Sequence, residues 1–365
     1  MAALDYPAPA PYCIGMSRDP TLRPGKLPAD LLERLLRSRE TPGGAVVGPG
    51  IGLDGAVLNL RPPARPGEEH DGAPPPFLVA ASDPITFTAE EIGWYAVHVN
   101  ANDVVCMGAL PRWFLATVLV PEGTVEADIA EIFDQMDRAC EEVGAGLVGG
   151  HTEITAGIDR PILVGTMLGV TTHWVSAAGA RPGDALLLAG GIAVEGTAIL
   201  ARDAADRLAG RVDDVVLDRA RRFLHDPGIS VLRPARAALA SGAVHALHDP
   251  TEGGLAAGIH ELCDASGTGA RVDLQAVHVF DETRALAGPF GIDPMGLIAS
   301  GSLLITVPDD DATAVLDELS GQAIHAARIG SIQHAALGVM AVEDGGERPL
   351  PRFEADEIGK AFDPG

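Results

Sequence analysis

Residues 100–112 read NANDVVCMGALPR and carry three polar side chains inside a predicted helix. Apolar residues at helical spacing predict that helix over residues 89–107. Asn100, Asn102 and Asp103 are unfavourable there, because their short side chains compete for the backbone hydrogen bonds of a helix. A metal ion or a polyphosphate bound by these side chains would compensate for that cost. A break in the helix is the alternative explanation.

Strands and helices alternate on both sides of this helix. Before it, the apolar pattern predicts an amphipathic helix at 28–39 and strands at 56–60 and 77–82. The segment 61–76 between these strands is rich in Pro, Gly and Glu, which is typical of a hairpin loop. After the helix, we expect a strand at 113–120, a helix at 125–143, a short strand at 146–149 and a longer strand at 162–170.

A turn at residues 181–184, Arg-Pro-Gly-Asp, begins a second run of elements. We expect strands at 185–189, 243–247, 302–307 and 326–329, and helices at 195–203, 230–241, 254–265 and 310–319. This order gives a βαβ-rich first half and a second half in which helices and strands alternate, and 365 residues favour two domains. The predicted organisation is a flexible arm at 1–24, an N-terminal domain at 25–171, a C-terminal domain at 172–345 and a tail at 346–365.

The composition argues against several classes of partner. The formal net charge of −25 repels nucleic-acid phosphates and anionic membranes, so we expect neither as a partner. No run of 18 apolar residues suggests a membrane span, and the N-terminus lacks the pattern of a secretory signal. None of the four cysteines lies in a Cys-x-x-Cys pair, which favours reduced thiols and a cytoplasmic protein.

A glycine-rich segment, GPGIGLDGA at residues 48–56, precedes the first predicted strand. Gly50 and Gly52 would let the backbone approach a phosphate, and Asp54 could bind Mg²⁺. An ordinary turn is the alternative explanation. The segment is not a Walker A loop, because no Gly-Lys-Ser/Thr follows, and it is not a dinucleotide fingerprint, because it leads into a strand.

Two further polar segments follow predicted strands. Asp83, in Ser-Asp-Pro, closes the strand at 77–82, where a carboxylate can point into a crevice, although an Asx turn before Pro84 is an equal explanation. Residues 149–155 read GGHTEIT. In them Glu153 could bind a metal or accept a hydrogen bond from a substrate, and His151 could act as a base, although a lone histidine is more often structural.

The last polar segment is HDPTEGGL at residues 248–255. Asp249 ends a predicted strand, Thr251 is a plausible N-cap, and Gly253 and Gly254 start a helix whose N-terminus favours anions. Mg²⁺ takes oxygen ligands and shares them with phosphates, so the separated carboxylates suit two or more Mg²⁺ ions on a triphosphate. The sequence contains no cluster with zinc spacing and no Gly-x-Ser-x-Gly elbow.

The order of these motifs resembles the aminoimidazole ribonucleotide (AIR) synthase superfamily, from about residue 25 to about residue 342. The resemblance implies a two-domain α+β protein with a PurM-like fold and a homodimer, in which strands of both N-terminal domains form a β-barrel. It also implies an ATP site in the cleft between the domains, near the partner subunit. The implied Mg²⁺ ligands are Asp54, Asp83, Asp103 and Asp249. The implied nucleotide-binding residues are Gly50, Gly52, Asn102, Gly149, Gly150, Thr251, Gly253 and Gly254. The expected catalytic residues are Asp83, Asp103, His151 and Glu153.

Residues 86–94 and the GGHTE segment look most like the HypE-type hydrogenase maturation proteins of this superfamily. Those proteins use ATP to dehydrate a thiocarboxamide on a C-terminal cysteine, in a tail that normally ends Pro-Arg-Ile-Cys. This sequence ends KAFDPG and its last cysteine is Cys263, a departure that bears on the dehydration and not on ATP binding. Selenophosphate synthetases fit less well, because Cys13 has no nearby lysine. The sequence assigns no reactivity to Cys13 or Cys106.

The resemblance therefore implies an Mg²⁺-dependent, ATP-binding enzyme. It would hydrolyse ATP or transfer its phosphoryl group to activate an oxygen of a small carbonyl, amide or phosphate substrate, mainly by positioning and charge neutralisation. One alternative is a small-molecule kinase that resembles thiamine-monophosphate kinase. Another is a non-catalytic nucleotide-binding protein that acts in maturation or regulation. The partner would be a small-molecule substrate or a maturation protein.

Overall fold

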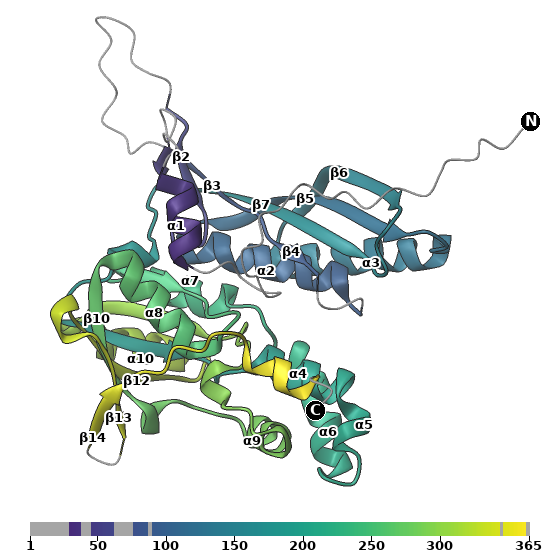
Figure 1. Ribbon diagram of the computed structural model, residues 1–365. Helices are drawn as coiled ribbons and strands as arrows, with labels where there is room; N and C mark the ends of the chain where they lie inside the picture. The colour runs from purple at the N-terminus through teal and green to yellow at the C-terminus, as the bar shows by residue number, and fades with distance from the viewer. Residues whose placement is uncertain (1–28, 38–44, 62–75, 87–89, 344–345, 363–365) are drawn as a thin grey trace, which may run out of the picture.

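The computed structural model describes residues 29–37, 45–61, 76–86, 90–343 and 346–362 (Figure 1). The arm predicted at 1–24 and most of the loop predicted at 61–76 lie outside these residues. The chain forms two sheets, one in each half of the sequence, and helices lie between and around them. In the part of the chain described, no helix is both long enough and apolar enough to cross a membrane.

The N-terminal sheet has the strand order β1-β2-β3-β7-β5-β6, and β4 also pairs with β7. Its strands are β1 Ala45–Val47, β2 Ala56–Asn59, β3 Phe77–Ala81, β4 Pro84–Ile85, β5 Leu110–Pro121, β6 Gly146–Thr155 and β7 Ile162–Thr171. Its helices are α1 Ala29–Arg37, α2 Ile92–Cys106 and α3 Glu126–Val143. The inner face of the sheet is covered by α2 and α3, and alternate residues of β5 and β7 are buried against them.

The C-terminal sheet has the strand order β14-β13-β10-β12-β8-β11-β9. Its strands are β8 Asp184–Ala189, β9 Ala246–His248, β10 Thr268–Asp273, β11 Leu303–Pro308, β12 Ala326–His334, β13 Val339–Glu343 and β14 Gly346–Pro349. The helices are α4 Val194–Asp203, α5 Ala205–Leu208, α6 Asp214–Arg221, α7 Leu232–Ala240, α8 Gly254–Ser266, α9 Asp281–Ala287 and α10 Ala312–Gly321. Every residue of β8 is buried, as expected for a strand covered on both faces.

The predicted α+β class and alternation of elements are confirmed, with three differences. The strand predicted at 146–149 extends to Thr155, because β6 pairs with β5 along its whole length. Elements β1, β4, β10, β13, β14, α5, α6 and α9 were not predicted. The stretch after residue 345, which we expected to form a tail, packs on the C-terminal sheet instead. There β14 pairs with β13, and Leu350 is buried.

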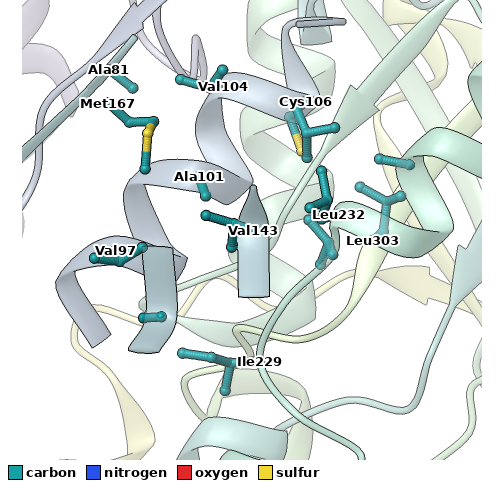
Figure 2. Packing of buried hydrophobic residues seen from close by; sticks show 14 of the residues in the cluster. Ala81, Val97, Ala101, Val104, Cys106, Val143, Met167, Ile229, Leu232 and Leu303 are labelled. Carbon is teal, nitrogen blue, oxygen red and sulfur yellow. The ribbon is translucent and has the colours of Figure 1, made fainter. Parts of the chain in front are cut away.

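Helix α2 lies between the two halves of the molecule (Figure 1). Its apolar side chains pack on the N-terminal sheet and also join a core cluster that contains Leu232 and Leu303 of the C-terminal half (Figure 2). The side-chain amide of Asn102 connects the two halves of the chain through hydrogen bonds. It donates to the carbonyl of Ile229 at 2.8 Å and accepts from the backbone N–H of Val231 at 2.9 Å.

We predict that Asn102→Ala destabilises the protein by roughly 1–3 kcal/mol, because it leaves a buried backbone donor and a buried acceptor without partners. Chemical denaturation of the purified protein measures this change. Asn59→Ala is the matched control, since Asn59 is exposed and accepts one short-range hydrogen bond from the Arg61 backbone. Equal losses in the two variants would contradict a linking role for Asn102.

Candidate functional site

Four aspartates from separate segments converge where the two halves meet. Asp54 follows the glycine-rich segment, Asp83 follows β3, Asp103 lies in the last turn of α2, and Asp249 follows β9. Asp103 and Asp249 are 8% and 3% exposed. Atoms of Asp54, Asp249 and Cys106 that could bind a metal lie within 4.8 Å of one another. Asp103 interacts with the other three, so the structure brings together four of the five carboxylates that the sequence suggested and leaves out Glu153.

Several oxygens of this aspartate cluster lack a hydrogen-bond partner among the described residues. They are Asp54 Oδ2, Asp103 Oδ2 and both carboxylate oxygens of Asp249. A buried polar atom without a partner is costly, and native proteins compensate such atoms with water or ions. Unpartnered carboxylate oxygens are the ligands that hard divalent cations prefer. The donor set therefore fits a divalent cation such as Mg²⁺.

The electrostatics of the cluster favour bound protons when no cation is present. Burial, and then the charge of Asp54, raise the pKa of Asp249 to about 8. Burial, followed by the charges of Asp249 and Asp83, raises the pKa of Asp103 well above its usual range. Burial, followed by the charges of Asp249, Asp54 and Asp103, also raises the pKa of the Cys106 thiol. A cation at the cluster would replace these protons.

His248 supplies a positive charge beside the cluster. Its Nδ1 lies 2.7 Å from Asp54 Oδ1, and its Nε2 lies 3.1 Å from Glu261 Oε2. Burial lowers the pKa of His248, but the contacts with Asp54 and Glu261 raise it more, so the net pKa lies well above the usual value. The ion pair also connects the N-terminal half to β9 and α8. Sequence reasoning missed His248 as a site residue, although it directly precedes Asp249, and nothing in the sequence marked Glu261.

In the glycine-rich segment, Gly52 packs against the backbone of helix α8. This residue has φ +67°, and a Cβ there would overlap the carbonyl oxygen of Glu261 in α8. Gly50 has a looser requirement, since its Cβ would meet only the side chain of Leu53. We predicted that both glycines let the backbone approach a phosphate. At Gly52 the close approach is to helix α8.

The two asparagines of α2 bind backbone groups. Asn100 accepts a hydrogen bond from the Asp83 N–H at 2.9 Å and donates to the carbonyls of Asp83 and Ala96, so it fixes the turn that carries Asp83. Asn102, which we expected to bind nucleotide, uses both ends of its amide on Ile229 and Val231. The cost of polar residues in α2 is therefore offset mainly by backbone partners, and only Asp103 joins the cluster.

The GGHTEIT segment lies apart from the aspartate cluster. It forms β6, the edge strand, which is separated from β3 by β5 and β7. Gly149, Gly150, His151 and Glu153 are exposed, and His151 Nε2 lies 3.0 Å from Glu153 Oε2. Within one chain, the two residues expected to be catalytic there do not reach the four aspartates.

The N-terminus of α8 is occupied by a carboxylate of the chain itself. Asp356 accepts hydrogen bonds from the N–H groups of Gly253 at 2.7 Å and Ile298 at 3.3 Å. The N-cap residue is Gly253, so the prediction of Thr251 as the cap is wrong. Gly254 has φ +67° and lies against the backbone of Met295, so its conformation serves packing.

Comparison with known proteins agrees with this architecture. Residues 54–171 match the N-terminal domain of AIR synthase related proteins, and residues 181–342 match the C-terminal domain. The chain is 32% identical over 266 residues to carbamoyl dehydratase HypE of Cupriavidus necator. The aligned region covers 70% of this chain and 73% of that protein. It is 32% identical over 270 residues to HypE of Azotobacter vinelandii, covering 71% and 76%.

A solved structure with the same fold is hydrogenase maturation protein HypE in complex with ATP. The TM-score is 0.65 at 29% identity, and the match covers 82% of this chain and 90% of that chain. A thiamine monophosphate kinase of Aquifex aeolicus, at 21% identity and TM-score 0.59, shares the fold. The predicted two-domain PurM-like fold is thus confirmed.

We predict that the metal-free protein loses stability as the pH rises from about 4 to about 8. Asp249 has a pKa of about 8 in the folded protein and an ordinary value of about 4 when unfolded, so the folded state binds an additional proton in this window. The expected loss is roughly 1–4 kcal/mol. Chemical denaturation in the presence of a chelator measures it across the pH range.

The variant Asp249→Asn should only partly flatten this dependence of stability on pH. Asp103 and Glu195, whose pKa values are also raised by burial, the latter to about 7, act in the same direction. Asp310→Asn is the control, since Asp310 is exposed. A slope that is unchanged in Asp249→Asn would show that this carboxyl does not hold a proton in the folded protein.

Proposed function

Since the chain belongs to the AIR synthase related protein family, we propose that it binds ATP with Mg²⁺ and uses ATP to activate an oxygen atom of a small substrate. The observation that carries the proposal is the aspartate cluster with its unpartnered buried oxygens. Such a cluster costs free energy when it is empty, and a cation shared with a triphosphate offsets that cost.

The residues that would hold Mg²⁺ are Asp54, Asp83, Asp103 and Asp249. When bound, Mg²⁺ neutralises charge on the phosphates and orients them. The protein's own groups do the positioning. Asn100 holds the turn of Asp83, and His248 fixes Asp54 against the C-terminal half. The site therefore depends on contacts between the two halves of the chain.

The substrate we propose is a carbonyl or amide compound whose oxygen is phosphorylated. Relatives at 32% identity are named carbamoyl dehydratases, and a carbamoyl group is an amide. An amide oxygen is a poor leaving group, and transfer of a phosphoryl group to it makes it a good one. The complex of a HypE protein with ATP supports ATP as the phosphoryl donor.

The assembly we propose is a homodimer that pairs through β6. Among the strands that the structure describes, β6 is an edge that pairs only with β5, and Val148 and Ile154 on it are 57% and 62% exposed. Pairing would cover these side chains. It would also place His151 and Glu153 at the subunit boundary.

We predict that Asp103→Asn and Asp249→Asn weaken Mg²⁺-dependent ATP binding by about tenfold or more, equivalent to about 1.4 kcal/mol. Both variants should remain folded, because each removes a repelling buried carboxylate. Calorimetry with Mg²⁺ and with a chelator measures binding, and ADP release is followed in the same sample. Asp310→Asn is the control for a loss of one negative charge.

ATP affinity that is equal with and without Mg²⁺, and unchanged in both variants, would contradict the proposed site. ADP release with a stable phosphorylated product would identify a kinase in place of an activating enzyme. Tight binding without ADP release in the presence of candidate amides would identify a nucleotide-binding protein.

For the dimer, we expect Ile154→Lys to give a monomer in sedimentation velocity measurements, while wild type sediments as a dimer. The introduced ammonium groups would repel each other across paired β6 strands. Val215→Lys is the control, since Val215 is 64% exposed and lies on α6. A dimer that persists in Ile154→Lys would exclude β6 as the interface.

A further inference from the structure

Cys106 brings a thiol into the aspartate cluster. It is the last residue of α2 and lies one helical turn beyond Asp103, so the two side chains share a face of the helix. Its side chain is fully buried. Sγ and carboxylate oxygens of Asp54 and Asp249 lie within 4.8 Å of one another, a spacing that one metal ion can bridge.

The Cys106 side chain has apolar neighbours on one side and a carboxylate on the other. Figure 2 shows it at the end of α2 beside Leu232 and Leu303, in the apolar cluster where a buried thiol usually packs. Its other side meets Asp249, whose two oxygens are buried and have no side-chain donor stronger than this thiol among the described residues. A thiol is a weak donor and satisfies such oxygens poorly. A cation between them would satisfy both.

We propose that Cys106 is a metal ligand and that Asp54, Cys106 and Asp249 hold a divalent ion softer than Mg²⁺, of the Co²⁺ and Zn²⁺ class. Thiolate ligands favour Co²⁺ and Zn²⁺, whereas a site made only of carboxylates favours Mg²⁺. On binding, the thiol releases its proton to solvent and the thiolate donates an electron pair, with no change of oxidation state.

This inference rests on the proposed function only because the two sites share the carboxylates of Asp54 and Asp249. Each carboxylate has two oxygens, so Asp54 and Asp249 would be shared between this ion and the Mg²⁺ that accompanies ATP, which Asp83 and Asp103 would also hold. The ion held by Cys106 would then be resident in the protein, and its charge would offset the repulsion that the buried carboxylates create. Three protein ligands also leave a position open to a phosphate oxygen.

Titration with Co²⁺ alone tests the proposal, because a thiolate bound to Co²⁺ has a charge-transfer absorption in the near ultraviolet that carboxylates lack. We expect the band in wild type and its loss in Cys106→Ser, with Co²⁺ affinity reduced by about tenfold or more. Cys140→Ser and Cys263→Ser should keep the band, since both thiols are buried and neither belongs to the group formed by Asp54, Cys106 and Asp249. A band that persists in Cys106→Ser would overturn the proposal.

A second measurement does not need a variant of Cys106. In the triple variant Cys13→Ser, Cys140→Ser, Cys263→Ser, Cys106 is the remaining thiol, and X-ray absorption of bound Zn²⁺ should contain one sulfur neighbour at about 2.3 Å. Zn²⁺ bound without sulfur would overturn the proposal. The calorimetry of ATP binding tests the proposed function independently of this sulfur signal. Mg²⁺-dependent ATP binding without the sulfur signal would contradict only the assignment of Cys106 as a ligand. The sulfur signal without ATP binding would contradict only the nucleotide function.

Discussion

Repulsion among buried carboxylates is the constraint on which this structure depends. Asp54, Asp103 and Asp249 come from three different segments, yet they share one site between the two halves of the chain. Burial, and then the charges of neighbouring carboxylates, raise the pKa values of Asp103 and Asp249. The fold can hold these groups together only if protons, His248 or a bound cation supply the opposing charge.

Helix α2 makes this arrangement possible because its polar side chains contact different parts of the structure. Asn100 holds the Asp83 turn, Asn102 holds the segment before α7, and Asp103 and Cys106 face the other carboxylates. The apolar side chains between them fill the core on both sides of the helix. Binding at the cluster is therefore coupled to contacts between the halves, since the same helix provides both.

Sequence patterns predicted the features that depend on local order. Periodicity predicted most helices and central strands. The carboxylates of Asp54, Asp83 and Asp249 at turns and strand ends, with Asp103 inside a helix, predicted a shared site, to which Glu153 was wrongly added. Contacts between distant segments were beyond such reasoning. Gly52 fits against Glu261 of α8, and His248 joins Asp54 to Glu261, although these residues are far apart in the chain. The exposure of β6 likewise follows from strand order, which local patterns do not specify.

The most direct test of the central claim is a crystal structure with Mn²⁺ and a non-hydrolysable ATP analogue, measured for anomalous scattering. The account predicts a manganese peak in contact with carboxylate oxygens of Asp103 and Asp249, with phosphate oxygens of the analogue on the same ion. Bound nucleotide with no metal peak at these aspartates would contradict it, and so would a metal bound only to exposed acidic residues.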